Sequence, residues 1–344
     1  MEVSLSTLRF KLVLTWLLCL CSIIATIQIL FWLFTEDSYH SKRQDFDVRA
    51  DSLEAMALGV SHSRAIHFPS LGISGFSYHD PGSDLQTAAE KYRAIAPLTP
   101  NLKYILIPIS PPYLHFIQTA ENRASRELTV HSNYPEYSNF NGALYWTLLL
   151  HNPERMLWKL RNSFRQKLEA LTPQLEISKR LLTCQPIRLK NLDHENGFIG
   201  GYFDVYPDGK CLGELAISTV NSHANQTVQS ESLLENFEIN KVKMAEMIQE
   251  IAANQHQLIL YIPPFTSEYY DHKSWETVKL EQQVYLQELS LNPNVLFVDY
   301  HDLFYKRNYL ETNTLFYDDD HLGLKGAKEF SKILGRDIRQ LESQ

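Results

Sequence analysis

Short apolar runs and longer amphipathic stretches follow one another along most of the chain. Apolar runs bounded by Gly, Pro or polar residues predict buried strands, and apolar residues at helical spacing predict amphipathic helices. The predicted strands are 52–58, 65–71, 102–110, 257–262 and 295–300, and the predicted helices are 84–95, 232–254, 276–289 and 324–341. Alternation of strand and helix at these lengths predicts an α/β domain with a mostly parallel sheet that helices cover on both faces.

The N-terminal part of the chain has a different pattern. Residues 12–34 are almost wholly apolar and contain no charged residue, Gly or Pro, and a spanning helix needs about 20 such residues. The run is too long for the apolar region of a cleavable signal peptide, and a buried core helix of this length would have a polar face. Arg9 and Lys11 precede the run, whereas Glu36 and Asp37 follow it. The sequence therefore predicts a cytoplasmic N-terminus at 1–11, an uncleaved anchor at 12–34, a linker at 35–50 and an exported, periplasmic domain at 51–344.

The middle of the chain, about 113–230, breaks the alternation of strand and helix. It is rich in aromatic residues and Asn, and its Cys184–Leu215 part favours loops and a hairpin, so we predict an insertion that forms a lid or cap. Whether Cys184 and Cys211 form a disulfide stays open, because spacing alone does not show that they meet. The net charge of −8 argues against a nucleic-acid partner, since binding to a nucleic-acid backbone requires a basic surface.

Two segments at opposite ends of the domain carry candidate chemistry. In the first, Gly59 permits a tight turn after a buried strand and would present Ser61 at the carboxyl edge of the sheet. In the second, Asp318 precedes His321 by three residues, so a turn can bring the carboxylate against the imidazole. Ser63 competes with Ser61 for the role of nucleophile. Each segment also has an ordinary explanation, a turn serine in one case and an acidic loop before a helix in the other.

Taken together, the two segments resemble the SGNH/GDSL hydrolase superfamily. The resemblance rests on Gly-x-Ser after the first strand, on Ile73-Ser74-Gly75 in the next loop, and on Asp-x-x-His before the last helix. Its most specific part, Asp318–Leu322 followed by Gly326-Ala327, is similar to the C-terminal block of membrane-anchored bacterial members. The resemblance implies a flavodoxin-like three-layer sandwich with Ser61 as nucleophile, His321 as base and Asp318 as its orienting partner. It also implies that the backbone N–H groups of Ser61 and Gly75 form part of the oxyanion hole.

The chain departs from the superfamily pattern in two places. Val60 replaces the Asp of the usual Gly-Asp-Ser, and Ser110-Pro111-Pro112 stands where a Gly-x-Asn-Asp block is expected after the strand that ends near Ile109. The side-chain amide that would bind the oxyanion is therefore missing or comes from elsewhere, with Asn133, Asn139 and Asn141 as alternatives. Loss of one such donor typically lowers the rate by about 10²–10³.

The remaining histidines and cysteines do not indicate a metal or cofactor. There is no HExxH motif, no paired Cys/His spacing and no Gly-rich phosphate loop, so we predict neither a metal nor a cofactor. His62, His79, His115 and His301 are expected to have surface or packing roles.

The sequence therefore predicts an extracytoplasmic serine esterase or O-acyltransferase that acts through an acyl-enzyme. By the resemblance, its substrates are acyl esters, chiefly acetyl esters, of envelope carbohydrate or small acyl esters, and a membrane acyl-donor protein is a candidate partner. The alternative is a catalytically weak or inactive protein of SGNH fold that binds polysaccharide or assists assembly. The missing Asn block and the aromatic-rich insertion favour that alternative.

Overall fold

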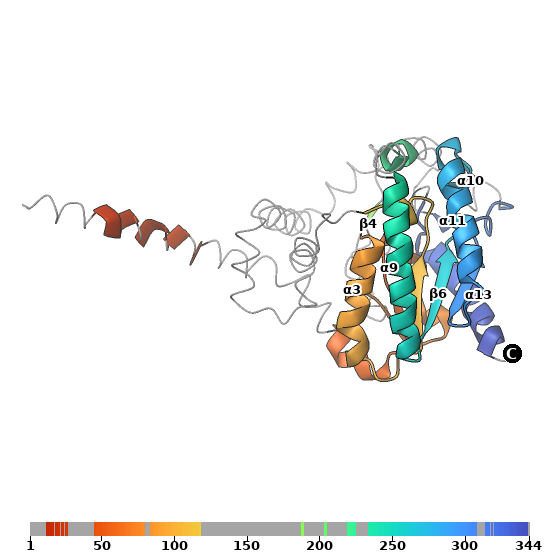
Figure 1. Ribbon diagram of the computed structural model, residues 1–344, viewed down its shortest axis with the longest axis horizontal. Coiled ribbons are helices and arrows are strands. Elements are labelled where there is room, and N and C mark those ends of the chain that lie inside the picture. The colour runs from red at the N-terminus through yellow and green to blue at the C-terminus, as the bar shows by residue number, and fades with distance from the viewer. Residues whose placement is uncertain are drawn as a thin grey trace, which may run out of the picture.

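The computed structural model shows a five-stranded parallel sheet with helices on both faces (Figure 1). The structure describes residues 12–16, 18–20, 22–23, 25–26, 45–79, 83–117, 187–188, 203–204, 219–224, 233–307, 314–316, 318 and 320–342. The predicted α/β class is confirmed. The described elements of the domain are η1 Ala50–Ser52, β1 Ala55–Ala57, η2 Ser61–Ala65, α2 Phe68–Leu71, β2 Gly75–Ser77, α3 Leu85–Ile95, η3 Ala96–Leu98, β3 Tyr104–Pro108, η4 Tyr113–His115, β4 Ile187–Arg188, β5 Phe203–Asp204, α9 Leu233–Ala253, β6 Gln257–Ile262, α10 Ser267–Tyr270, η7 Lys273–Trp275, α11 Glu276–Leu289, β7 Val295–Asp299 and α13 Leu324–Glu342.

The strands of the main sheet lie in the order β2-β1-β3-β6-β7, and every neighbouring pair is parallel. In chain order this is 2-1-3-4-5, one of the two common arrangements of doubly wound sheets. The chain reverses its direction of winding between β1 and β3. In such sheets ligands bind at the carboxyl ends of the strands beside that reversal, and both β1 and β3 end there.

Alternate residues of the strands pack into two separate cores. On one face, Met56, Ile105 and Leu258 belong to a core shared with α3, α9 and α11. On the other face, Ala55 and Leu106 belong to a core shared with α2 and α13. Strand side chains point alternately to opposite faces, so a sheet covered on both sides has apolar residues at every position.

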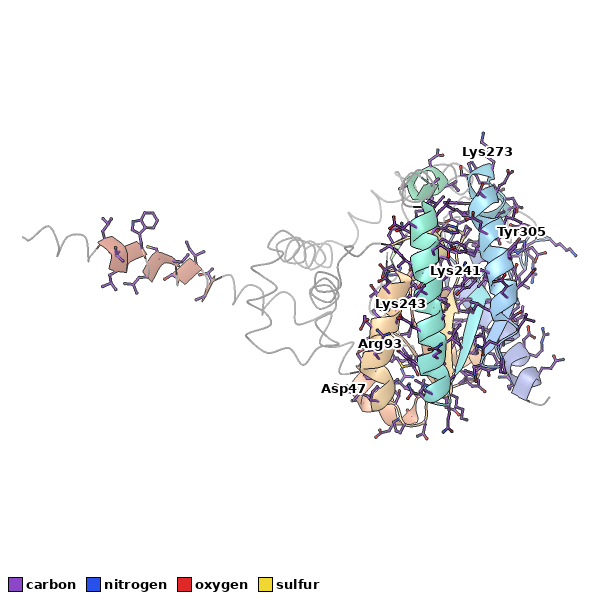
Figure 2. The ribbon with its side chains drawn as sticks, in the orientation of Figure 1. Asp47, Arg93, Lys241, Lys243, Lys273 and Tyr305 are labelled. Carbon is purple, nitrogen blue, oxygen red and sulfur yellow. The ribbon has the colours of Figure 1, made fainter. Side chains whose placement is uncertain are left out.

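The helices α3 and α9 lie side by side on the first face (Figures 1 and 2). The guanidinium of Arg93 on α3 donates hydrogen bonds from Nε and Nη2 to the Glu250 carboxylate on α9, at 2.6–3.0 Å. A bidentate pair of this kind fixes the orientation of two helices more than it stabilises the fold, because both side chains are about one-third exposed.

Most of the elements predicted from periodicity are confirmed. The helices 84–95, 232–254, 276–289 and 324–341 correspond to α3, α9, α11 and α13, and the strands 102–110, 257–262 and 295–300 contain β3, β6 and β7. Residues 187–188 and 203–204 form a small antiparallel pair, β4 with β5, inside the segment predicted to contain a hairpin.

The strand predicted at 65–71 is wrong. This segment ends η2 and then forms the short helix α2, in which the His67 ring accepts a hydrogen bond from the Ser70 amide as an N-cap and Pro69 occupies the first turn. The second strand in chain order is instead β2, at Gly75–Ser77. A buried apolar run of this length does not distinguish strand from helix, and here the helix allows Phe68 and Leu71 to pack against α13.

Two domain boundaries also need correction. The predicted linker at 35–50 ends inside the fold, because Phe46 is fully buried and packs edge-on against Tyr78. The predicted insertion begins too early, because Tyr113 and Leu114 in η4 are buried in the first core beside α9. Asn240 of α9 donates a hydrogen bond to the Leu114 carbonyl at 2.9 Å, which ties η4 to that helix.

Several predictions fall wholly or partly outside the described residues. Cys184, Cys211 and most of the predicted insertion lie there. The predicted anchor at 12–34 is described only at 12–16, 18–20, 22–23 and 25–26. Within the described part of the chain, no helix has both the length and the apolar composition that crossing a membrane requires.

The helix α13 packs tightly against the segment that follows the nucleophile candidate. The Ser331 hydroxyl accepts a hydrogen bond from the His67 amide at 2.7 Å and donates one to the Ala65 carbonyl at 3.2 Å. Gly335 lies so close that an added Cβ would stand 2.1 Å from the Leu71 carbonyl oxygen. This contact fixes the C-terminal helix, and the loop before it, relative to η2 and α2.

Gly335→Ala is expected to lower the free energy of unfolding by about 1–3 kcal/mol, because the methyl group must displace the Leu71 backbone. That loss outweighs the roughly 1 kcal/mol by which Ala is favoured over Gly inside a helix. Urea unfolding measures the change, and Lys332→Ala on the exposed face of the same helix is the control. A Gly335→Ala variant as stable as the parent protein would contradict the close packing.

Candidate active site

Ser61 follows β1 after a turn that requires glycine. Leu58 continues the strand pairing by donating its amide to the Leu106 carbonyl at 2.9 Å, and Gly59 then adopts a φ of 100°, which side chains of L-residues rarely tolerate. Val60 returns to extended geometry and precedes η2, whose first residue is Ser61. The chain thus reverses sharply at the carboxyl edge of the sheet and leaves Ser61 at the beginning of a short helix.

The competing serine has a different role. Ser63 is fully buried, and its hydroxyl donates a hydrogen bond to the Leu58 carbonyl at 2.7 Å. That bond closes the turn between β1 and η2. Ser63 therefore stabilises the turn, and Ser61 is the hydroxyl that remains at the pocket.

The opposite side of the site is a loop immediately before α13. Phe316 and Leu322 form an isolated antiparallel bridge, and the Gly323 amide donates to the Leu315 carbonyl at 2.8 Å. Inside this loop, Asp318 Oδ1 accepts hydrogen bonds from the backbone amides of Asp320 and His321, at 3.2 and 2.7 Å. Short acidic side chains commonly order turns in this way, and here the turn brings the carboxylate against the His321 ring.

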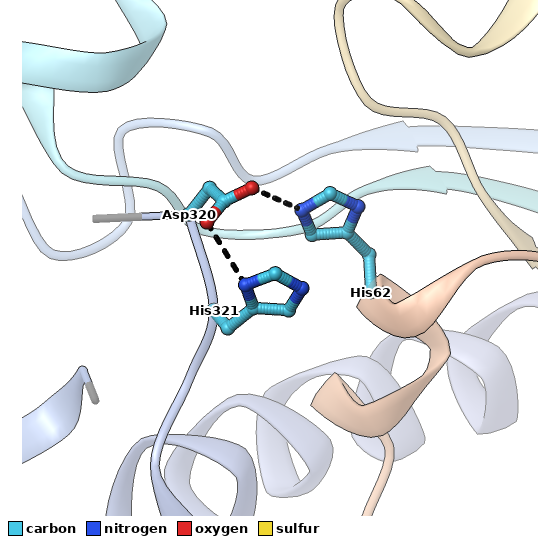
Figure 3. Close-up of side chains that lie close together, drawn as sticks. All are labelled: His62, Asp320 and His321. Atoms are coloured by element: carbon cyan, nitrogen blue, oxygen red, sulfur yellow. Dashed lines mark ion pairs between the residues drawn. The ribbon is translucent and has the colours of Figure 1, made fainter. Parts of the chain in front are cut away.

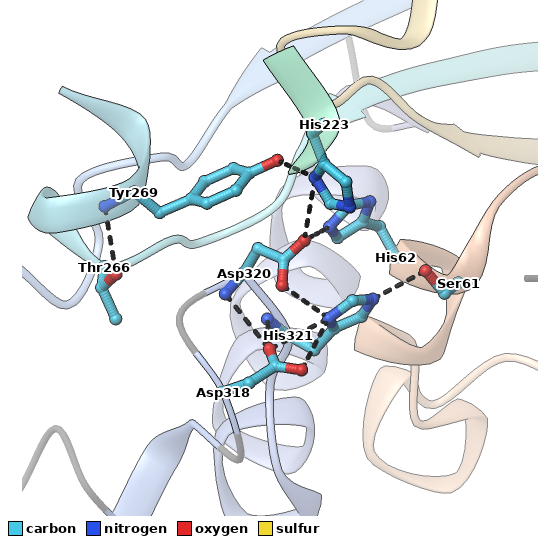
Figure 4. A network of polar contacts seen from close by, with 8 residues as sticks. All are labelled: Ser61, His62, His223, Thr266, Tyr269, Asp318, Asp320 and His321. Atoms are coloured by element: carbon cyan, nitrogen blue, oxygen red, sulfur yellow. Dashed lines mark hydrogen bonds and ion pairs between the residues drawn. The ribbon is translucent and has the colours of Figure 1, made fainter. Parts of the chain in front are cut away.

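The two segments meet through Ser61 and His321 (Figure 4). His321 Nε2 lies 2.6 Å from Ser61 Oγ, although the residues are 260 positions apart in the sequence. On the other side of the ring, Nδ1 lies 3.0 and 3.2 Å from the two oxygens of Asp318. The three residues chosen from the sequence are therefore joined in the order hydroxyl, imidazole, carboxylate.

The structure adds three residues that the sequence did not single out for this site. Asp320 Oδ1 lies 2.9 Å from His321 Nδ1, and Asp320 Oδ2 lies 3.3 Å from His62 Nε2 and 3.9 Å from His223 Nδ1. His62, expected to be a surface or packing residue, is buried and stacks on His321 with ring centroids 4.5 Å apart. His223 comes from the described helical segment 219–224 and also contacts the Tyr269 hydroxyl at 3.0 Å.

These neighbours shift the pKa values of the two imidazoles in opposite directions. Burial alone would lower the pKa of His321, but Asp318 and Asp320 outweigh burial and raise it to about 10. Burial and the adjacent His321 lower the pKa of His62 to about 4, although Asp320 opposes that shift. These shifts favour the neutral form of His62 and the protonated form of His321.

The two carboxylates also differ from each other. Burial raises the pKa of Asp318, and the charge of His321 offsets only part of that rise. The pKa of Asp320 lies well below its ordinary value despite burial, because His321 and His62 stabilise its charge. Asp320 is thus the carboxylate that stays ionised most firmly.

Ser61 and His321 border a narrow pocket that opens to solvent. Its walls come from η2, from the segment after β6, and from the loop before α13, namely Ser61, His62, Arg64, Ala65, Pro263, Pro264, Asp320, His321 and Leu322. Arg64 Nε donates a hydrogen bond to His79 Nε2 at 3.1 Å, and His79 Nδ1 lies 3.0 Å from the Ser77 hydroxyl. This chain of hydrogen bonds holds the Arg64 guanidinium at the pocket wall.

The predicted oxyanion donor Gly75 is wrong. The parallel register pairs Gly75 with Ala55, at the amino end of β1, whereas Ser61 lies beyond the carboxyl end of that strand. Since a strand rises about 3.3 Å per residue, Gly75 is much too far from Ser61 to share an oxyanion. An added Cβ at Gly75 would stand 2.0 Å from the Phe68 ring, so the glycine serves packing.

The N–H of Ser61 stays a predicted oxyanion donor. The first hydrogen bond of η2 is donated by the Ser63 amide to the Val60 carbonyl at 3.0 Å, so the amides of Ser61 and His62 take no bond within the helix. Both stand next to the nucleophile candidate. The alternatives Asn133, Asn139 and Asn141 lie outside the described residues.

The same residues offer a set of atoms that could ligate a cation. His62, Asp320 and His321 place one ligand atom each within 4.8 Å of one another. Two imidazoles and a carboxylate suit zinc. However, a cation at His321 Nδ1 would displace the hydrogen bonds to Asp318 and Asp320 and would hold the ring in a form unable to accept a proton.

Comparison with known proteins identifies no family. No family model matches the chain, and no curated protein matches it. Among solved structures, a protein from Streptococcus pneumonia provisionally described as a platelet activating factor is similar at a TM-score of 0.38 and 11% identity, over 92% of this chain and 98% of that chain. A likeness at this level supports no conclusion about activity, so the function has to be argued from the geometry of the site.

Proposed function

We propose that this chain is a serine esterase or O-acyltransferase of SGNH type that forms an acyl-enzyme on Ser61. The observation that carries the proposal is the 2.6 Å contact between Ser61 Oγ and His321 Nε2, with His321 Nδ1 held by Asp318. The strand order 2-1-3-4-5 supports a flavodoxin-like sandwich, as the resemblance implies. A serine becomes nucleophilic when an adjacent base takes its proton, and a third group must orient that base.

In the proposed reaction the neutral form of His321 accepts the Ser61 proton at Nε2 while Oγ attacks the ester carbonyl carbon. Asp318 stabilises the imidazolium that forms, and the N–H groups of Ser61 and His62 donate hydrogen bonds to the carbonyl oxygen as it becomes negative. The tetrahedral intermediate collapses when His321 returns the proton to the departing alkoxide. Water or a sugar hydroxyl then attacks the acyl-enzyme by the same steps in reverse order.

The substrate class and the location come from the resemblance to membrane-anchored bacterial members of the superfamily. The proposed substrates are acyl esters, chiefly acetyl esters, of envelope carbohydrate. The proposed arrangement is an anchor at 12–34 and an extracytoplasmic domain. A membrane acyl-donor protein would supply the acyl group if the reaction is a transfer.

Reaction with a fluorophosphonate probe tests the nucleophile. The probe should label the parent protein covalently at Ser61, because an activated serine attacks phosphorus and the adduct does not turn over. Ser61→Ala should abolish the labelling. Ser63→Ala, which removes a hydroxyl only two residues away, should still be labelled at Ser61, although more slowly, because the lost bond to Leu58 loosens the turn. Intact-mass spectrometry reads the result, and labelling that persists in Ser61→Ala would eliminate Ser61 as the nucleophile.

A weak or inactive carbohydrate-binding protein is the second candidate function. Two observations favour it: the high pKa of His321 leaves little neutral base at pH 7, and Ser110 stands where the superfamily has its Asn block. This candidate predicts no hydrolysis of any acetylated sugar in a panel, together with saccharide binding that survives His321→Ala. The esterase proposal predicts hydrolysis that EDTA leaves unchanged and that His321→Ala removes.

A further inference from the structure

Asp320 is a buried carboxylate to which the proposed reaction assigns no role. Only 2% of the residue is exposed, and its two oxygens point to two different imidazoles (Figure 3). Oδ1 lies 2.9 Å from His321 Nδ1, and Oδ2 lies 3.3 Å from His62 Nε2. A buried carboxylate is unfavourable unless positively charged or hydrogen-bonding partners stabilise it. Of the two imidazoles beside Asp320, His321 has the raised pKa. The carboxylate of Asp320 therefore stabilises the protonated form of the His321 ring.

His62 lies against Asp320 on the other side: Nε2 is 3.3 Å from Oδ2, a close contact that does not meet hydrogen-bond geometry in this structure. The ring is 6% exposed, lies nearly parallel to His321 with an interplanar angle of 11°, and meets the edge of Phe265 at 5.3 Å. Because His62 is neutral at ordinary pH, it can direct an N–H toward Asp320 without placing a second positive charge beside His321. Its place in the chain directly after Ser61 links the nucleophile turn to this carboxylate.

Titratable and charged groups face His321 from each of the elements around it. Asp318 and Asp320 belong to the same loop as His321. From η2 come His62 and Arg64. His223 comes from segment 219–224, and Tyr269, which contacts His223, comes from α10. Asp318 and Asp320 carry the negative charges of this group. Since both lie within 3.2 Å of Nδ1, they dominate the proton affinity of the ring.

We propose that Asp320, in contact with His62, is a second positioning residue for His321 that shares its Nδ1–H with Asp318 and thereby sets the pH range in which Ser61 can be activated. The expected change in kcat/KM rests on the proposed function. The expected change in the protonation of His321 rests on the geometry alone. Two carboxylates stabilise the imidazolium more than one does. The imidazolium formed during attack is therefore favoured, but the resting ring holds its proton until the solution is alkaline.

Ser61 should react faster as the pH rises, because His321 must lose its proton before it can accept one from Ser61. Below the pKa of His321, the fraction of neutral ring falls about tenfold for each pH unit, so kcat/KM should rise about tenfold per unit from pH 7 and level off near pH 10. Without the charge of Asp320 the ring loses its proton at lower pH, so the profile should move toward neutrality. The plateau should fall at the same time, because the imidazolium is stabilised less.

The first test measures His321 directly and does not depend on activity. Histidine-labelled full-length protein is titrated by NMR, with and without Asp320→Asn, in the presence of EDTA. The midpoint of the His321 resonance should move to lower pH by about 1–3 pH units on loss of one adjacent charge. Asp299→Asn is the matched control, because Asp299 pairs with His301 Nδ1 at 2.8 Å in the same way, and it should move His301 but leave His321 unchanged.

Two variants of His62 provide the second test. His62→Gln keeps an N–H donor for Asp320 and should retain most of the His321 midpoint and of the pH profile. His62→Phe keeps the stacked ring but removes the donor, and it should move both in the direction of Asp320→Asn. This pair separates positioning from packing, and it remains available if Asp320→Asn does not fold.

The outcomes separate this inference from the proposed function. An unchanged His321 midpoint in both Asp320→Asn and His62→Phe overturns the role of Asp320, whatever the activity. A shifted midpoint in a protein that hydrolyses no ester and reacts with no fluorophosphonate supports the Asp320 assignment and overturns the esterase. A shifted midpoint together with a kcat/KM profile that moves by the same amount supports both.

Discussion

His321→Gln is expected to lower kcat/KM for an acetyl ester by roughly 10⁴–10⁶-fold, the largest effect of any single change outside Ser61. Gln fills part of the ring's volume and can still contact Ser61, but it cannot accept a proton from the hydroxyl. The loss should therefore appear in kcat, while KM changes little. Hydrolysis of p-nitrophenyl acetate, compared at pH 7 and pH 9, measures it, and the alkaline rise of the parent protein should vanish with the ring.

The matched control for that variant is His115→Gln. His115 is also a fully buried imidazole paired with a carboxylate, with Nε2 2.8 Å from Glu281 Oε2 and the ring stacked on Phe237 at 4.4 Å. It does not line the pocket. Its replacement should lower the free energy of unfolding and leave kcat/KM close to that of the parent. Equal losses of kcat/KM in the two variants would mean that the effect at His321 is structural.

The parts of the fold that local periodicity specifies were predictable from the sequence. β6 and α11 match their predicted bounds. In β6 an apolar run follows Gln257 and ends before Pro263-Pro264, and in α11 a fourteen-residue amphipathic stretch is bounded by polar or turn residues. Residues 65–71 were not predictable in this way. Their apolar residues are buried by α13, more than 250 positions later, and a short buried run suits either kind of element.

The candidate site was predictable where its contacts lie within a single turn, or where its motifs stand in the same order along the chain as in the SGNH/GDSL superfamily. Asp318 and His321 meet through a turn of four residues, and Ser61 follows a glycine that the backbone requires. Gly75 was predicted wrongly because strand register, which no short motif encodes, decides which end of the sheet a residue occupies. His62 was predicted to have a surface or packing role, and Asp320 was given no role. Adjacent residues usually point apart, and only the tertiary fold shows that both side chains turn toward His321.

Gly59→Ala is expected to damage both stability and catalysis, since this residue shapes the turn that presents Ser61. At a φ of 100°, an Ala residue is strained by about 1–3 kcal/mol. Its Cβ would also stand 3.1 Å from the Tyr113 hydroxyl oxygen and 3.6 Å from Pro108 Cδ. Relief of this contact moves the turn, and a shift of about 1 Å at a nucleophile can cost about 10²-fold in rate. Thermal unfolding and kcat/KM, both measured well below the melting temperature, test the two effects.

Gly72→Ala separates strain from catalysis. Gly72 also has a positive φ, 76°, but it ends α2, and its added Cβ would meet only the flexible end of Arg339 at 3.1 Å. The variant should lose a similar amount of stability and keep its kcat/KM.

A second comparison isolates the steric clash between an added methyl group at Gly59 and the Tyr113 hydroxyl. Tyr113 is buried, and among the described residues its hydroxyl has no hydrogen-bond partner, so Tyr113→Phe alone should change little.

Combining Tyr113→Phe with Gly59→Ala should then recover part of the lost rate and stability, because the oxygen nearest to the new methyl group is gone. The remaining loss is the backbone strain at φ 100°, which no side-chain change relieves. A double variant no better than Gly59→Ala would show that strain alone displaces Ser61. A Gly59→Ala variant with the kcat/KM of Gly72→Ala would show that the position of Ser61 does not depend on this turn.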